Sequence, residues 1–221
     1  MIRVHHLNNS RSQRVLWLLE ELQVPYEVVR YERSSRTLLA PAALKEVYPL
    51  GKSPVIEDAG RKFAETGLIV DYLVDRYGQH LAPARGTEPY WRYRYWLHYA
   101  EGSFAPPLLL KLVIDKLGPL GWPAQSFVRS QLELHLNFLE GELARSEWFA
   151  GPEFTAADIM MSFPLEISVS RAGLDATRPR LWNFLQRVHA RPAYARALER
   201  GGTYVYASAG PAPGANPGAT A

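Results

Sequence analysis

The first eighty residues contain hydrophobic patterns of two different periods. Residues 2–7 form an apolar, strand-like run, and residues 26–31 alternate between apolar and polar positions as a half-buried strand does. Between them, apolar residues recur at helical spacing from Arg11 onward. This helix is expected to end before Pro25, because proline disfavours helical backbone in the residue that precedes it. The order strand, helix, strand predicts a compact α/β unit.

The same unit continues with a second group of short elements. Pro41 can open a short helix over 42–47. Residues 53–58 and 61–63 are expected to be two strands joined by an Asp-Ala-Gly turn, and a helix is expected from 65 to about 77. The complete order is βαβ followed by ββα.

The rest of the chain shows helical patterns. A stretch rich in glycine, proline and alanine, residues 78–89, is interpreted as a linker. A long helix capped by Thr87 is expected to run toward a kink at Pro106-Pro107. A second long helix is expected over 123–146.

A capping box precedes the next apolar helix, with Thr155 at its first position and Asp158 in place of the usual glutamate. Two shorter helices fit 178–190 and 192–200. The final residues are rich in alanine, glycine and proline and cannot bury a core, so a flexible tail is expected. We therefore expect three parts: an α/β domain over 1–80, a helical domain over 86–206 and a tail over 207–221.

Composition narrows the class of protein. Of the 221 residues 47% are hydrophobic, which is enough for a substantial core. The formal net charge of +3 is too small to indicate nucleic acid or an anionic membrane as a partner. The most apolar run, FAPPLLLKLVI, is shorter than the roughly 18–20 residues of a membrane span, and the start shows no secretory signal. A cytoplasmic protein is expected.

The chain contains no cysteine. Disulfides, thiolate metal sites and cysteine nucleophiles are therefore excluded, and no metal is expected. Thiol chemistry at this protein requires a thiol that arrives with a ligand.

The turn NNSRSQR, residues 8–14, lies between the first strand and the first helix. It has no glycine to cradle a phosphate, and Ser10 lacks the small neighbours of a hydrolase nucleophile. One interpretation is structural, because Ser10 and Gln13 have the spacing of a capping box. The other is an anion or thiolate at the helix N-terminus, where backbone N–H groups and the hydroxyl of Ser10 can donate hydrogen bonds.

Two further turns offer similar chemistry. Pro54 at the start of a strand makes Ser53-Pro54 a candidate cis bond that presents the backbone of Ser53 to a ligand. Glu65 and Thr66 stand at another helix N-terminus, which suits a carboxylate. Three such features within one βαβ-ββα unit favour a binding site over three unrelated turns.

With these residues the chain resembles the cytosolic glutathione transferases over nearly its whole length. The N-terminal part is similar to their thioredoxin-like α/β domain, and the remainder is similar to their all-α helical domain. The stretches that resemble the GTT-type branch of fungi and bacteria are SRSQRVLWLLEEL, YPLGKSPVIED, AETGLIVDYL, YAEGSFAPPLLL, FLEGELA and FTAADIMMSFPLE.

The resemblance implies a role for the residues of the first two turns. Ser10 corresponds to the serine that contacts the glutathione sulfur, and Ser12 and Arg11 are the alternatives for this contact. Ser53 before Pro54 corresponds to the residue whose backbone pairs with the cysteinyl part of glutathione.

The resemblance also implies contacts for the two ends of glutathione. Glu65 and Thr66 correspond to the pair that holds the γ-glutamyl group, and Lys52 corresponds to a basic residue near the glycyl carboxylate. Leu39 stands where theta-type relatives have a histidine, so the glycyl carboxylate is expected to rely on Lys52 or Arg36.

A second substrate is implied between the domains. Phe104 and Leu108 are candidate apolar walls, although their helical spacing equally suits ordinary core positions. Family members dimerise through the long helix, which implies a homodimer in which Glu101 reaches the glutathione amine of the other subunit. The segment 88–99 mixes arginines with aromatic residues and is interpreted as a dimer or domain interface rather than as a nucleic-acid surface.

The implied function is that of a glutathione S-transferase. Glutathione would act as co-substrate, and its thiolate would attack a hydrophobic electrophile or reduce a peroxide. The alternative is a non-catalytic protein of the same fold that binds a partner, as some bacterial stress proteins do. The glutathione-site residues favour the enzyme, because a pure scaffold does not need them.

Overall fold

The computed structural model describes residues 1–34, 36–37 and 39–207. The expected tail, residues 207–221, lies outside the described residues except for Ala207.

A four-stranded mixed sheet forms the centre of the first part of the chain. Its strands are β1 (Ile2–Leu7), β2 (Tyr26–Tyr31), β3 (Val55–Asp58) and β4 (Arg61–Ala64). They stand in the order β2-β1-β3-β4. Strand β1 is parallel to β2 and antiparallel to β3, and β3 is antiparallel to β4. The parallel pair requires a crossover, and a helix between β1 and β2 supplies it.

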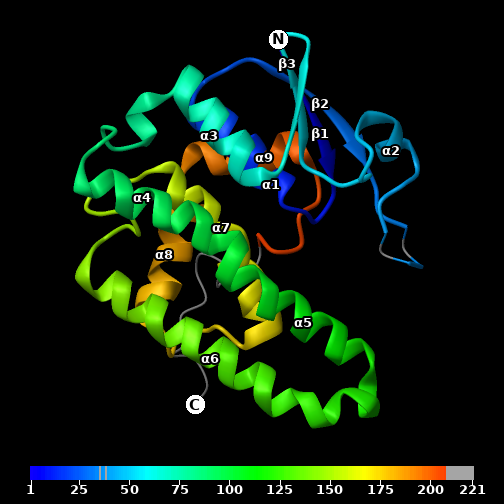
Figure 1. The fold of residues 1–221 in the computed structure, drawn as a ribbon, viewed down its shortest axis with the longest axis vertical. Coiled ribbons are helices and arrows are strands. Elements are labelled where there is room, and N and C mark those ends of the chain that lie inside the picture. The colour runs from blue at the N-terminus through cyan, green and yellow to red at the C-terminus, as the bar shows by residue number, and fades with distance from the viewer. Residues whose placement is uncertain (35, 38, 208–221) are drawn as a thin grey trace, which may run out of the picture.

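Three helices pack on this sheet: α1 (Ser12–Glu21), α2 (Ala43–Val47) and α3 (Thr66–Tyr77). Figure 1 shows α1 and α3 on the side of the sheet that faces the remaining helices, and α2 on the other side. Residues 12–19 of α1 are all buried, polar ones included. Helix α1 is therefore enclosed by its neighbours, and its polar side chains need partners inside the protein.

The rest of the described chain is mainly helical, as the pattern predicts. Helix α9 returns to the first domain and packs against α1 and β2. The elements of this part are η1 (Gln79–Leu81), α4 (Glu88–Tyr99), η2 (Ala100–Phe104), α5 (Ala105–Lys116), η3 (Gly118–Gly121), α6 (Trp122–Arg145), α7 (Ala156–Ala172), α8 (Pro179–His189) and α9 (Pro192–Gly201).

The kink predicted at Pro106-Pro107 takes the form of a wider turn just before the prolines. Neither proline has an N–H, so the carbonyls four residues earlier, in Gly102 and Ser103, lack their ordinary helical donors. Segment η2 has π-helical geometry, and the chain then continues as α5. The hydrophobic pattern alone does not indicate α5 as a separate helix.

The capping box predicted for α7 is confirmed. Asp158 Oδ2 accepts a hydrogen bond from the Thr155 N–H at 2.8 Å, and Asp158 Oδ1 accepts one from the Phe149 N–H at 2.9 Å. Burial raises the pKa of Asp158 to about 6, although these hydrogen bonds act in the opposite direction. The box therefore starts α7 and also fastens the loop that leads into it.

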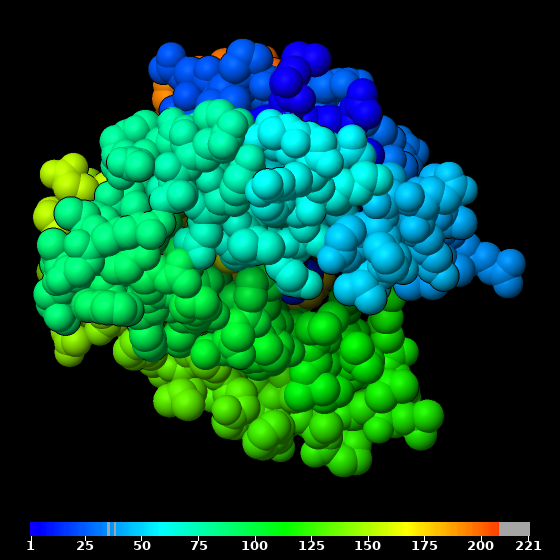
Figure 2. All heavy atoms as spheres, turned by 45° about the horizontal axis from the view of Figure 1, so that its top comes forward, coloured from blue at the N-terminus to red at the C-terminus, as the bar shows by residue number. Residues whose placement is uncertain are grey.

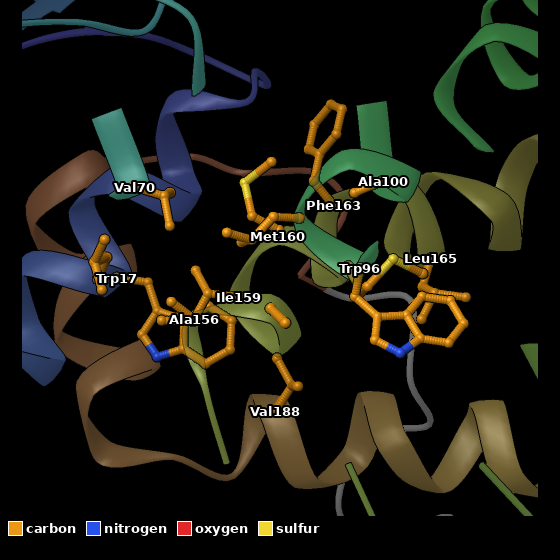
Figure 3. Packing of buried hydrophobic residues seen from close by; sticks show 14 of the residues in the cluster. Trp17, Val70, Trp96, Ala100, Ala156, Ile159, Met160, Phe163, Leu165 and Val188 are labelled. Atoms are coloured by element: carbon orange, nitrogen blue, oxygen red, sulfur yellow. The ribbon is translucent and has the colours of Figure 1, made fainter. Parts of the chain in front are cut away.

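The hydrophobic core is continuous between the two domains. Figure 3 shows Trp17 of α1 and Val70 of α3 directed toward Ile159 and Met160 of α7. All four side chains are completely buried. Because apolar burial contributes about 25 cal/mol per Å², this shared core holds the two domains in one arrangement.

Candidate functional site

The pairing register brings three parts of the chain to one end of the sheet. Strands β1 and β3 pair through His5 and Val55, and β3 and β4 pair through Val55 and Ala64. Toward the same end of the sheet, Leu7 lies two residues after His5, Ser53 two residues before Val55, and Thr66 two residues after Ala64. The opening turn, the Ser53-Pro54 bond and the start of α3 therefore converge at this sheet end. Figure 2 shows a narrow hollow where the cyan surface of the first domain meets the green surface of α4 and α5.

The backbone N–H of Leu7 lies between two serine hydroxyls at this sheet end. It is 3.2 Å from Ser12 Oγ and 3.3 Å from Ser53 Oγ. The Ser53 hydroxyl donates to the His5 carbonyl at 2.9 Å. The Ser53-Pro54 bond is cis, which confirms the candidate named from the sequence. The side chain of Ser53 thus fastens the loop before β3 to β1, and the role of its backbone toward glutathione stays a prediction.

Ser10 lies directly beside Ser12. The two Oγ atoms are 2.7 Å apart, and Ser10 Oγ accepts a hydrogen bond from the Ser12 N–H at 3.2 Å. The capping box suggested by Ser10 and Gln13 is absent, because α1 begins at Ser12 with Arg11 at the N-cap position and no side-chain cap, and Ser10 Oγ accepts from the Ser12 N–H instead. Both polar side-chain atoms of Gln13 are buried without a hydrogen-bond partner among the described residues. Ser10 therefore has a structural hydrogen bond at the start of α1, although not in the capping box expected with Gln13, and its role toward a ligand stays a prediction.

His6 joins the same group of side chains. Its Nδ1 lies 2.9 Å from Ser12 Oγ, and the residue is 3% exposed. Burial, aided by the charge of Arg30, lowers the pKa of His6 to about 4, and a backbone hydrogen bond at Gly201 acts in the opposite direction. His6 is therefore neutral at pH 7. The sequence patterns assign His6 no role, because a histidine in a strand does not show which side chain it contacts.

The start of α3 has an unusual backbone. Glu65 has φ +68° and ψ 118°, which is sparsely populated for a residue with a side chain. Its side chain is exposed, whereas Thr66 is buried, and Lys52 is exposed next to Ser53. The structure thus brings these predicted glutathione contacts to one sheet end. Their binding roles stay predictions.

A buried charge network links the opening turn to the helical domain. The guanidinium of Arg14 is bound by the carboxylate of Glu101 and donates to the Met160 carbonyl at 2.7 Å. Arg11 Nε donates to the other oxygen of Glu101 at 2.8 Å. Burial raises the pKa of Glu101, but the charges and hydrogen bonds of Arg14 and Arg11 outweigh it and the net pKa is lowered.

This network bears on the predicted cross-subunit role of Glu101. Both of its carboxylate oxygens already have arginine partners within the same chain. Contact with the glutathione amine of another subunit stays a prediction.

The candidate second-substrate residues lie inside the helical domain. Phe104 and Leu108 are both 0% exposed, and the Phe104 ring packs 5.7 Å from that of His135. The structure therefore places them in the core cluster, and their role as walls of a substrate site stays a prediction.

Both parts of the chain match models of one protein family. A family model described as the N-terminal domain of glutathione S-transferase matches residues 4–81, and one described as the C-terminal domain matches residues 98–201. The chain belongs to the glutathione S-transferase family. The fold expected from the resemblance, a thioredoxin-like domain followed by a helical domain, is confirmed.

Similar proteins come from fungi and bacteria. Glutathione S-transferase 3 of Schizosaccharomyces pombe is 36% identical over 75% of this chain and 73% of its own length. Glutathione S-transferase 1 of Saccharomyces cerevisiae is 30% identical over 90% of this chain and 95% of its own length. A solved glutathione S-transferase from Actinobacillus pleuropneumoniae has a TM-score of 0.85 and 36% identity, covering 94% of this chain and 96% of its own. A sphingomonad enzyme complexed with glutathione, at 23% identity and a TM-score of 0.75, shares the fold; the match covers 90% of this chain and 98% of that one.

Membrane-spanning helices and metal-binding clusters are both absent from the described residues. Within them, no helix is long and apolar enough to cross a membrane. Nor does this part of the chain hold a group of three or more histidine and acidic side chains arranged to bind a metal ion.

Replacing Glu101 tests the buried network. In Glu101→Ala, Arg14 stays buried and keeps no charged partner, only the Met160 carbonyl and the face of the Phe163 ring. The unfolding free energy should fall by about 2–4 kcal/mol at fixed protein concentration, somewhat below the loss for a fully buried pair because Glu101 is partly exposed. Glu153→Ala, at an exposed position, is the control. A loss as small as that of the control, together with weaker glutathione binding, would favour the cross-subunit role instead.

Neutral His6 predicts a defined pH dependence of stability. Its folded pKa of about 4 lies below the ordinary 6.5, so its contribution is complete above pH 6.5 and is lost as the pH falls through 4. At 1.36 kcal/mol per pH unit, wild type should lose roughly 3 kcal/mol more than His6→Gln between pH 7 and pH 4. Denaturant unfolding at each pH measures the difference, with His80→Gln as the exposed control. Parallel profiles for wild type and His6→Gln would contradict the burial of a neutral ring.

Proposed function

We propose that the chain is a glutathione transferase in which the hydroxyl of Ser10 stabilises the glutathione thiolate. The observation that carries the proposal is the convergence of Ser10, Ser53 and the Glu65-Thr66 pair at one end of the sheet. Helices α1 and α3 both begin there, and helix N-termini favour negative charge. The names of the relatives and the glutathione in the sphingomonad structure agree with such a ligand.

The hydrogen bond from Ser10 and the N-terminus of α1 can supply the free energy needed to lower the pKa of the glutathione thiol. A free thiol has a pKa of about 8.5, and lowering it by about two units requires roughly 2.7 kcal/mol in favour of the thiolate. One hydrogen bond to a charged group contributes about 1.5–3 kcal/mol, and a helix N-terminus contributes about 0.3–1 kcal/mol. Ser10 and α1 are therefore sufficient, and no dedicated general base is needed.

The rest of glutathione would then extend along the sheet end. We propose that the backbone of Ser53 pairs with the cysteinyl part, that Glu65 and Thr66 hold the γ-glutamyl group, and that Lys52 stands near the glycyl carboxylate. Glu65 supports this assignment, since unusual backbone at a non-glycine residue is often retained at ligand sites.

The thiolate can serve two reactions in this account. It displaces a leaving group from, or adds to, a hydrophobic electrophile and forms a thioether. It also attacks the terminal oxygen of a hydroperoxide, which breaks the O–O bond, releases the alcohol and leaves the sulfur as a sulfenic acid. The thiol of a second glutathione then displaces water from the sulfenic acid and forms the disulfide. Both reactions use the same activated sulfur, so both depend on Ser10.

Ultraviolet titration of bound glutathione tests the role of Ser10. Wild type should show thiolate absorbance near neutral pH, and Ser10→Ala should raise the pKa of the bound thiol by about two units while changing the dissociation constant little. Ser126→Ala, at an exposed position of α6, is the matched control. If glutathione binds to wild type without ionising, the proposed activation is wrong.

Retention on immobilised glutathione separates the enzyme from the non-catalytic alternative. Wild type should be retained and eluted by free glutathione, and Glu65→Ala should be retained less, since it loses a proposed γ-glutamyl contact. Glu88→Ala, at an exposed position of α4, should behave as wild type. A wild-type protein that flows through would favour a scaffold that binds another partner.

A further inference from the structure

Arginines from separate parts of the chain gather beside the opening turn. Arg11 belongs to the turn itself, and Arg171 lies in the last turn of α7. Arg33 follows β2, and its Nε donates to the Asn8 carbonyl at 3.2 Å. Burial lowers the pKa of Arg33, and the charges of Arg11 and Arg171 lower it further, although Tyr206 acts in the opposite direction. The three guanidinium groups are therefore close enough to repel one another.

These guanidinium groups have more N–H donors than the neighbouring carboxylate can accept. Glu101 is shared between Arg14 and the Nε of Arg11. Among the described residues, neither terminal nitrogen of Arg11 has a hydrogen-bond partner. Arg171 has no carboxylate partner in the part of the chain that the structure describes, and its Nη1 lies 3.4 Å from the Leu108 carbonyl. Donors of positive charge thus remain available beside the turn.

Two aromatic rings lie next to the same guanidinium groups. The guanidinium of Arg11 is 5.5 Å from the centre of the Phe163 ring, and that ring packs edge-on against Tyr206 at 6.0 Å. The backbone N–H of Val205 donates to Asn9 Oδ1 at 2.9 Å, which holds the segment of Tyr206 against the turn. Asn9 and Arg11 flank the serine proposed to contact the sulfur. The rings and the available donors therefore lie close to the proposed position of the thiolate.

This combination of groups favours one class of electrophile. A guanidinium group binds an anionic group such as a carboxylate through charge-assisted hydrogen bonds, and its planar fork can bind both oxygens. An aromatic ring offers apolar area to the rest of the molecule. A neutral electrophile would cover the guanidinium groups without giving them an acceptor, and unpaired polar groups disfavour binding.

We propose that the second substrate carries an anionic group, held by Arg11 and Arg171, and an apolar or aromatic body that packs on Phe163 and Tyr206. The inference rests on the proposed function and names the class of its electrophile. The thiolate attacks the electrophilic carbon, the C–S bond forms as the bond to the leaving group breaks, and the leaving group departs with its electron pair. The anionic group keeps its charge throughout, so the arginines hold the substrate and exchange no proton with it.

Two unreactive compounds that differ in one group test the class of ligand. Para-toluate carries a carboxylate, para-toluamide carries a neutral amide on the same ring, and neither has a leaving group. In calorimetric titrations of the full-length protein saturated with glutathione, para-toluate should bind at least about tenfold more tightly, because hydrogen bonds between charged groups are the stronger kind. Equal affinities, or tighter binding of para-toluamide, would overturn the inference.

Substitution of Arg171 tests where the anionic group binds. Arg171→Gln should lower the ratio of the two affinities about tenfold, and Arg171→Lys should retain part of the ratio because it keeps the charge. Arg180→Gln, at an exposed position of α8, removes one positive charge elsewhere and is the matched control. A ratio that Arg171→Gln leaves unchanged would overturn the inference. So would a loss of glutathione binding in Arg171→Gln, because the arginine would then serve glutathione.

Turnover of two matched electrophiles separates this inference from the proposed function. Para-chloromethylbenzoate and para-chloromethylbenzamide both lose chloride to the thiolate, and kcat/KM relative to the uncatalysed reaction should favour the benzoate about tenfold. Failure of the proposed function appears as absent thiolate and no turnover of either compound. Failure of the inference appears as turnover without preference for the benzoate. Binding of para-toluate requires no turnover, so it tests the inference in either case.

Discussion

The buried guanidinium of Arg14 is the constraint on which the arrangement of the two domains depends. A charge inside a protein requires a partner, and Arg14 finds the carboxylate of Glu101 and the carbonyl of Met160, both in the helical domain. Helix α1 is thereby fixed against η2 and α7, and the shared apolar core around Trp17 adds to the same contact. Because Arg11 binds the same carboxylate, the start of α1 is held as well.

The candidate site follows from that placement. Once α1 is fixed, its first turn stands at the end of β1, where the amide of Leu7 needs acceptors and receives them from Ser12 and Ser53. The N–H of Leu7 thus contacts both the first turn of α1 and the loop before β3, two segments that lie far apart in the sequence. Ser10 belongs to this group, because its Oγ lies 2.7 Å from Ser12 Oγ.

The periodic features of the sequence predict most of the fold. Strands, most helices and the capping box at Thr155 leave local patterns that survive in the structure. The cis bond before Pro54 and the gathering of Ser10 with Ser53 were also accessible, since both follow from residue types at turns. The hydrogen bond between His6 and Ser12 and the pairing of Glu101 with two arginines were not accessible, because side-chain hydrogen bonds leave no periodic signal. The π-helical turn before α5 is associated with the N–H groups that Pro106 and Pro107 lack. The two prolines predict an interruption of the helix, but they do not show which backbone geometry replaces it.

A crystal structure of the protein with glutathione would test the central claim most directly. The sulfur should lie within hydrogen-bonding distance of Ser10 Oγ at the start of α1, with the γ-glutamyl group at the start of α3. A sulfur held by Arg11 or Ser12, or turned away from the opening turn, would contradict the assignment of Ser10 as the residue that stabilises the thiolate.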